Sequence, residues 1–266
     1  MANQPYENFV LQTLIEDQYK SGLDLMSFCT VDNSLQAAAG MKISRRRYRA
    51  TDGTEILAMS KGNTKLIEAS FTTDEVEVQL YQNHFMYYDE ELMKDPMLIE
   101  TGVRHGATDM WNTTRGDIMA ELNKATLTVN AQAYIFDAFV DAQTKLNLEN
   151  VEGVNIFGLV NPELMGTIRK ALKDDLKYVE AYARAGYVGT VAGVNLYTTK
   201  FVETANGVIV ATKEAVEYLN KTGAEVEIAA RGVDEANKRE NHVFNRKYGV
   251  PHFCDETKAV KIKVGA

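Results

Sequence analysis

The side chains that could support catalysis or metal binding are few and scattered along this chain. The candidates are His84, His105, His242, His252, Cys29 and Cys254. None of them has the His-x-x-x-His, His-Glu-x-x-His or Cys-x-x-Cys spacing that builds a metal site from one local segment. No Gly-x-Ser-x-Gly nucleophile elbow is present. The sequence therefore predicts no catalytic constellation, cofactor or metal, and leaves open only a metal site that folding would assemble.

One glycine-rich stretch, from Gly186 to Gly193, could suggest a phosphate-binding turn. A phosphate loop needs a following Lys-Ser or Lys-Thr pair and the start of a helix. Here the glycines lead instead into the apolar run Val194-Asn-Leu-Tyr197, which reads as a strand. The stretch therefore predicts a turn between strands, and a cytosolic α/β enzyme that binds a nucleotide remains the alternative from another class.

The overall composition is that of an ordinary folded protein, with 266 residues of which 45% are hydrophobic and 25% charged. The net charge of −8 gives no basic footprint for a sequence-reading nucleic-acid binder. Two cysteines far apart favour free thiols in a reducing compartment, although one long-range bridge stays open. No signal-peptide pattern and no run of about 18 apolar residues occur, so we expect synthesis in the cytoplasm and no membrane contact.

The charges are arranged in blocks of opposite sign. Residues 1–41 hold one lysine and five acidic residues, residues 42–66 hold seven basic and two acidic residues, and residues 67–100 hold one lysine and nine acidic residues. The middle block is thus +5, between blocks of −4 and −8. Such a pattern suits docking of one segment on an oppositely charged surface, within the chain or on a neighbour. The alternative is a solvated basic hairpin tip.

The elements expected to carry these charges begin with a long polar hairpin. Its strand signals start at Lys42, and turn signals follow at 51–54 and 61–64. Two strands alone are marginal in water, so this hairpin needs a surface to lie on. The alternation from Glu75 to Leu80 then predicts a half-buried strand.

A long helix is expected next. Asp95-Pro96 is a helix-start signal, and apolar residues then recur at spacings of three and four to about residue 125. Gly102, Gly106 and Gly116 weaken its intrinsic propensity, so packing must hold it. The second half alternates short strands with helices, including a helix opening at Asn161-Pro162 and a short helix over 213–219, and ends in strands.

This order of elements resembles the major capsid protein of tailed bacteriophages and prophages, the Hong Kong 97-like fold. The resemblance is strongest in three stretches, Phe85 to Asp95, Lys177 to Tyr197, and Arg239 to Ile262. It implies an α+β fold with an N-terminal arm (1–41), an extended β-hairpin loop (42–70), a peripheral domain with a long spine helix (71–129 and 223–266), and an α/β axial domain (130–222).

The resemblance implies a structural protein of the virion and not an enzyme. It would assemble in the host cytoplasm into hexamers and pentamers, which form an icosahedral shell around double-stranded DNA. Expected partners are other copies of the chain, a portal protein, packaged DNA bound without sequence specificity, and a decoration protein. Because no long helical extension precedes the arm, either a separate scaffolding protein is a further partner, which we expect, or the chain is already the mature product. An encapsulin-like bacterial nanocompartment shell is the alternative with the same fold.

Combined with the charge blocks, the resemblance gives a hypothesis for contacts between subunits. The basic hairpin would lie across the acidic surface of a neighbour. The residues expected at this contact are Arg45, Arg46, Arg47, Arg49, Lys61, Lys65, Asp89, Glu90 and Glu91.

Overall fold

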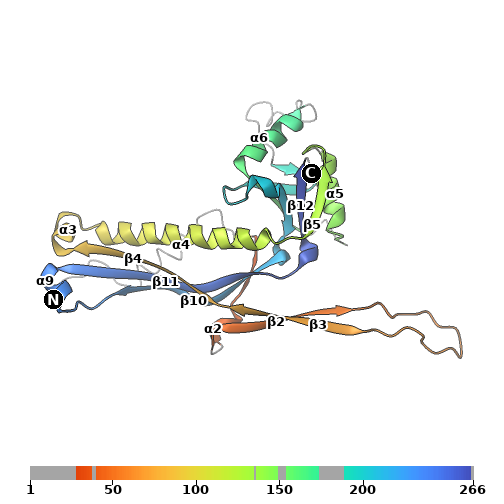
Figure 1. Ribbon diagram of the computed structural model, residues 1–266, viewed down its shortest axis with the longest axis horizontal. Helices are drawn as coiled ribbons and strands as arrows, with labels where there is room; N and C mark the ends of the chain where they lie inside the picture. The colour runs from red at the N-terminus through yellow and green to blue at the C-terminus, as the bar shows by residue number, and fades with distance from the viewer. Residues whose placement is uncertain (1–27, 38–39, 135, 149–153, 174–188, 265–266) are drawn as a thin grey trace.

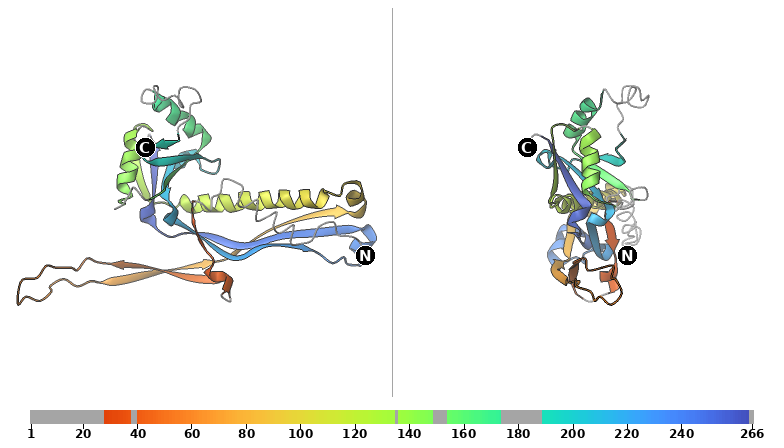
Figure 2. Two further views of the ribbon diagram at one scale, coloured as in Figure 1. Left: turned by 180° about the vertical axis from the view of Figure 1, so that it is seen from behind. Right: turned by 90° about the vertical axis from the view of Figure 1, so that its right-hand side faces the viewer.

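The computed structural model describes residues 28–37, 40–134, 136–148, 154–173 and 189–264, and side chains in these ranges except those of 47–49. Figure 1 shows an elongated body in which a long helix lies on a sheet, a lobe at one end of that helix, and a thin hairpin that projects away from the body. The turned views in Figure 2 place the lobe and the hairpin on opposite sides of the body.

The body is built on a four-stranded sheet in the order β1-β10-β11-β4. Its strands are β1 (Thr30–Asp32), β4 (Gln79–Tyr88), β10 (Val216–Ile228) and β11 (Glu240–Phe253). β11 pairs antiparallel with both β10 and β4, and β1 adds in parallel to β10. The sheet therefore joins three parts of the chain that are far apart in sequence. The short helix α9 (Val233–Lys238) connects β10 to β11.

The long helix α4 (Leu98–Leu122) packs along one face of this sheet, against β4, β10 and β11. At 1.5 Å per residue its 25 residues extend about 37 Å. The apolar stripe predicted from the sequence is buried, with Ile99, Val103, Trp111 and Ile118 at most 3% exposed. The helix begins at Leu98, shortly after the predicted signal Asp95-Pro96, because Pro96 and Met97 form a turn in which Asp95 accepts a hydrogen bond from the backbone N–H of Met97. The acidic run Asp89-Glu90-Glu91 before it forms a separate short helix, α3 (Asp89–Lys94).

The lobe contains a six-stranded mixed sheet in the order β5-β12-β9-β6-β8-β7. Its strands are β5 (Leu127–Ala131), β6 (Ile156–Val160), β7 (Thr190–Val191), β8 (Val194–Thr198), β9 (Val208–Thr212) and β12 (Ala259–Val264). Two helices lie beside this sheet, α5 (Phe136–Lys145) and α6 (Pro162–Ala171). α6 starts as predicted, since the Asn161 side chain accepts a hydrogen bond from the N–H of Glu163 with Pro162 in the first turn.

The projecting hairpin consists of β2 (Lys42–Ala50) and β3 (Ala69–Glu77), paired in register over their whole length. Beyond Ala50 and Ala69 the two arms continue to a turn at Met59 and Ser60. Within the described ranges, only the base of the hairpin packs on the body, where Val76 and Val78 join Leu219 and Val250 in a small apolar cluster. The short helix α2 (Ser34–Ala37) adds Leu35 to that cluster.

Four details differ from the sequence-based expectations. The helix expected over 213–219 is wrong, because only Lys213–Ala215 form a helical turn and Val216 already begins β10, whose backbone pairs with β11. The expected domain boundary at 222/223 falls inside that continuous strand. The C-terminal strand β12 lies in the lobe, between β5 and β9, whereas residues 223–266 were all expected in the body. The hairpin also extends past residue 70, to Glu77.

Candidate interaction surfaces

The outer half of the hairpin exposes large apolar side chains. Ile56 and Met59 are fully exposed, and Leu66 is 82% exposed. Nothing in the described chain covers them, because the arms contact only each other. Exposed apolar residues scattered singly are normal, but several along one thin projection indicate a surface that is covered in an assembly. The sequence signal was present in Ile56, Leu57, Leu66 and Ile67, yet we expected the hairpin to be poor in such residues.

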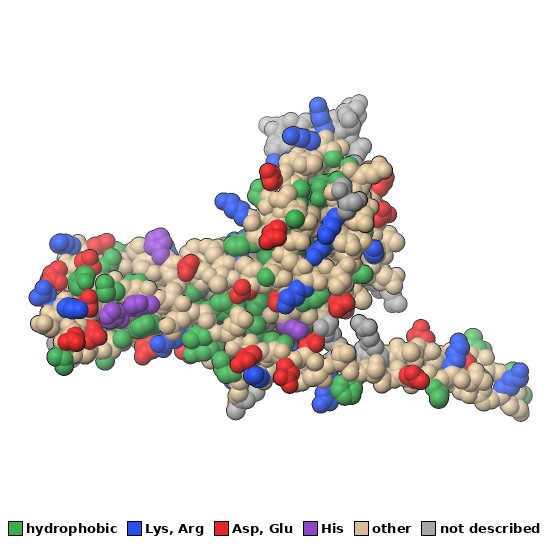
Figure 3. All heavy atoms as spheres, in the orientation of Figure 1, with side chains coloured by type: hydrophobic (Ala, Val, Ile, Leu, Met, Phe, Trp, Pro, Cys, Tyr) green, Lys and Arg blue, Asp and Glu red, His purple; other side chains and the backbone are tan. Residues whose placement is uncertain are grey.

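The predicted basic residues are spread along the hairpin. Lys61 and Lys65 lie in the exposed outer arms, and Figure 3 shows basic and apolar side chains side by side there. Arg46 is exposed on β2, with its guanidinium 5.4 Å from the ring centre of Phe71 on β3. The backbones of Arg47 and Arg49 lie in β2, but their side chains are outside the described residues.

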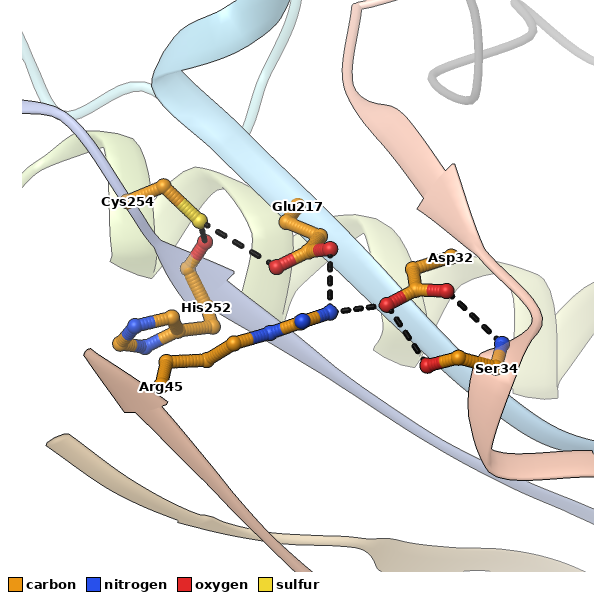
Figure 4. Close-up of polar contacts among 6 residues, drawn as sticks. All are labelled: Asp32, Ser34, Arg45, Glu217, His252 and Cys254. Carbon is orange, nitrogen blue, oxygen red and sulfur yellow. Dashed lines mark hydrogen bonds and ion pairs between the residues drawn. The ribbon is translucent and has the colours of Figure 1, made fainter. Parts of the chain in front are cut away.

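Arg45 differs from the other arginines, because it binds within its own chain (Figure 4). Its guanidinium forms an ion pair with Glu217 of β10 at 2.6 Å and a second ion pair with Asp32 of β1. Asp32 is held in turn by the N–H and the hydroxyl of Ser34, at 2.7 and 2.9 Å. Cys254 directs its thiol toward the other oxygen of Glu217, at 3.5 Å. The expectation that Arg45 faces a neighbouring subunit therefore does not match its contacts.

The two carboxylates that bind Arg45 have opposite pKa shifts. Burial raises the pKa of Glu217, and the attraction of Arg45 offsets this only in part. Burial also acts on Asp32, but the hydrogen bonds from Ser34 and Arg45 together outweigh it and hold its pKa below the ordinary value. Burial and the nearby Glu217 raise the pKa of the Cys254 thiol to about 12. Neither Cys29 nor Cys254 forms a disulfide bond, and the raised pKa makes Cys254 a poor nucleophile.

An acidic groove of about 640 Å³ lies where the hairpin leaves the body, between β3, the end of α4 and the end of β11. The carboxylates that line it are Asp74, Glu75, Glu77, Glu121 and Glu256. Lys124 is the lysine in its lining and already forms an ion pair with Glu121 at 2.5 Å. Glu77 is paired with Lys42 at 3.2 Å. The groove therefore keeps an excess of negative charge that a basic segment could offset.

The other predicted acidic residues lie at the far end of the body, in α3. Asp89 accepts hydrogen bonds from Arg231 and from Asn241, each at 2.9 Å, and its pKa is lowered by these bonds. Glu90 forms an ion pair with Arg239 at 2.5 Å, and Glu91 accepts from the N–H of Tyr88 at 3.0 Å. These carboxylates fasten α3 to the strand ends. Figure 1 places them at the opposite end of the molecule from the hairpin tip.

The remaining candidates for chemistry are the histidines and the glycine-rich stretch. His84 and His242 form a hydrogen bond at 2.8 Å across β4 and β11. In the described part of the chain, no three His, Cys, Asp or Glu side chains gather as a metal site, and no helix there is long and apolar enough to cross a membrane. Ala192 and Gly193 both have positive φ and join β7 to β8, which is the predicted strand turn. Residues 186–188 lie outside the described residues.

Known proteins of similar sequence and similar structure include capsid proteins of phages. No protein-family model matches the chain. It is 26% identical over 271 residues to a protein named major capsid protein from Staphylococcus phage phiMR11, covering 97% of this chain and 93% of that protein. The capsid structure of Cyanophage P-SCSP1u superposes with a TM-score of 0.68 at 10% identity, covering 91% of this chain and 88% of that chain.

A virus-like particle from Pyrococcus furiosus superposes with a TM-score of 0.64 at 10% identity, covering 96% of this chain and 98% of that chain. Matches of this kind establish architecture and not what a protein encloses. Each of these two structures covers at least 91% of this chain. The chain therefore has the α+β Hong Kong 97-like fold of tailed-phage capsid proteins. This confirms the fold that the order of its elements indicated.

Proposed function

We propose that this chain is the major capsid protein of a tailed bacteriophage, which self-assembles through hexamers and pentamers into an icosahedral shell around double-stranded DNA. The observation that carries the proposal is the hairpin, a projection with exposed apolar and basic side chains that, among the residues the structure describes, contacts the body only at its base. A protein that works alone has no use for such a projection. A neighbouring copy would cover it, and the phage relative supports the same function.

The proposal also fixes where the protein acts. It belongs to the virion, after assembly in the host cytoplasm, and has no catalytic role. A separate scaffolding protein, a portal protein and a decoration protein would be its other partners. Contact with packaged DNA would be independent of sequence and made through a few basic groups on the inner surface, because the wall of a shell must accept every sequence.

Electron microscopy of the overexpressed protein tests the function directly. We expect closed icosahedral shells or free capsomers, and nuclease-protected double-stranded DNA in particles purified from lysed host cells. A small stable oligomer that binds a nucleotide would contradict the proposal and favour an enzyme. Native shells that contain a protein cargo and no DNA would also contradict it, and would favour a nanocompartment of the same fold.

The contact between subunits can be narrowed from the predicted set. Asp89, Glu90 and Arg45 already have partners within the chain, so we propose that the outer hairpin charges, Lys61 and Lys65, meet the acidic groove of a neighbouring copy. The groove is rich in carboxylates, including the exposed Glu75. Exposed ion pairs contribute only about 0–1 kcal/mol each, so the effect would come from repetition over the many equivalent contacts of a shell.

Reversing these charges gives the corresponding prediction. Lys61→Glu with Lys65→Glu should raise the protein concentration needed for assembly, by roughly tenfold at low salt, because attraction becomes repulsion. The difference from the wild type should shrink near 1 M salt, where the screening length is about 3 Å. Light scattering measures both effects. Adding Glu75→Lys should restore part of the loss, and a double variant that assembles like the wild type at low salt would exclude this contact.

A further inference from the structure

The direction of the hairpin depends on very few contacts. β3 ends at Glu77 and β4 begins at Gln79, so on this side of the hairpin Val78 is the single residue that joins it to the body. The N–H of Val78 donates to the carbonyl of Met41 at 2.8 Å, which closes the base. The apolar cluster beneath the base is small. Apolar contacts are also not directional, so this cluster alone does not define an angle between hairpin and body.

Arg45 supplies a directional contact at this point. It is the fourth residue of β2, opposite Asp74 of β3, and its side chain reaches out of the hairpin to two strands of the body. One carboxylate comes from β1 and the other from β10, with Glu217 at 2.6 Å. The side chains of Arg45, Asp32 and Glu217 are 32%, 21% and 17% exposed, so the cluster is largely shielded from water. Charge-assisted guanidinium–carboxylate bonds have strong geometric preferences.

We propose that Arg45 is a positioning residue that sets the angle of the hairpin, acting as a clamp between β2 and the body strands β1 and β10. Because the hairpin is long, a small change of its angle at the clamp becomes a large displacement of its tip. From Arg45 to the turn at Ser60 the chain extends for about 50 Å at roughly 3.3 Å per residue. A tilt of about 10° at the base therefore moves the tip by about 9 Å, which is enough to miss a binding surface.

This role belongs to the single chain and holds whether or not the proposed shell is its function. The neighbouring Arg46 provides a matched comparison, because it has the same charge on the same strand but turns to Phe71 within the hairpin. Successive side chains of a strand point to opposite faces. Loss of Arg46 therefore leaves the clamp in place.

The test measures the distance between two spin labels on the full-length chain. One label is placed through Gly62→Cys near the hairpin turn, where a side chain meets open space, and the other through Ala120→Cys on the exposed side of α4. Cys29 is buried, and the pKa of the Cys254 thiol is about 12, so neither should react with the label. Measurements are made below the concentration at which the protein self-associates.

We expect one narrow distance distribution for the labelled parent protein and for its Arg46→Gln variant. Arg45→Gln should broaden the distribution at least twofold. The width for Arg45→Lys should lie between that of the parent and that of Arg45→Gln, because an ammonium cannot bridge both carboxylates as well as a guanidinium does. Should Arg45→Gln fail to fold in a melting experiment, Asp32→Asn removes one of the two carboxylates of the clamp and should also broaden the distribution, by a smaller amount because Glu217 still binds Arg45. A parent-like width in folded Arg45→Gln or Asp32→Asn, or equal broadening in Arg46→Gln, would overturn the proposal.

Discussion

Replacing Ile56 and Met59 together with serine is expected to abolish assembly while leaving the protomer folded. Both side chains are fully exposed near the end of the hairpin and contribute nothing to the core of their own chain. Burying an aliphatic side chain of this size contributes about 1.5–3 kcal/mol. Two of them give about 3–6 kcal/mol per hairpin contact, or a loss of roughly 10² to 10⁴ in the affinity of each contact.

Sedimentation and negative-stain microscopy measure the assembly, and thermal melting measures the fold. We expect no shells from the serine variant and a melting temperature like that of the wild-type protomer. The matched control is Ile56→Val with Met59→Leu, which keeps both positions apolar and should still assemble. Shells of normal yield from the serine variant would mean that the hairpin tip is not buried between subunits.

The long helix could be predicted from the sequence because its signal is strong and local. The apolar residues at spacings of three and four are the ones that α4 buries against the sheet. The short helix α3 before it could not be predicted, because an acidic run beside a capping residue can form either solvent-facing coil or a short helix. The choice depends on Arg231 and Arg239, which come from a distant part of the chain and fasten α3 in place.

The start of β10 could not be predicted in the same way. The segment 213–219 is short and its apolar residues fit either period, so pattern alone does not decide between helix and strand. Pairing of Val216 to Leu219 with Phe253 to Val250 decides it in favour of the strand. The placement of β12 in the lobe has a similar cause. A strand pattern predicts a strand, but not which of several sheets it joins.

The sequence alone could not tell which candidate contact residues face outward and which bind within their own chain. A run of three arginines predicts a basic strand, yet alternation places neighbours on opposite faces, and only the folded chain brings Asp32 and Glu217 to Arg45. The exposed apolar residues of the outer hairpin were missed for the opposite reason. An apolar pattern in a sequence is interpreted as a set of residues buried in the core of their own chain, whereas the hairpin tip lies too far from the core for its apolar residues to be buried there.

Close packing of the long helix gives the largest expected effect on stability. Gly106 lies against a pair of amides, the half-buried Asn83 and the buried Asn245. The Asn83 side chain donates to the carbonyl of Gly106 at 2.6 Å and accepts from the Asn245 side chain at 2.7 Å. A Cβ at Gly106 would lie 2.5 Å from Nδ2 of Asn245 and 2.8 Å from Oδ1 of Asn83. Glycine is therefore required here for space, although it weakens the helix.

Gly106→Ala should lower the free energy of unfolding by about 2–4 kcal/mol, since overpacking and the loss of buried hydrogen bonds outweigh the roughly 1 kcal/mol gained in helix propensity. Gly116 of the same helix is the matched control, because a Cβ there would meet Phe201 only at 3.9 Å. Gly116→Ala should raise the free energy of unfolding by up to about 1 kcal/mol. Urea unfolding of the two variants thus gives opposite signs if α4 rests on the sheet through Gly106, whereas stabilisation by both would mean that the helix lies farther from β4 and β11.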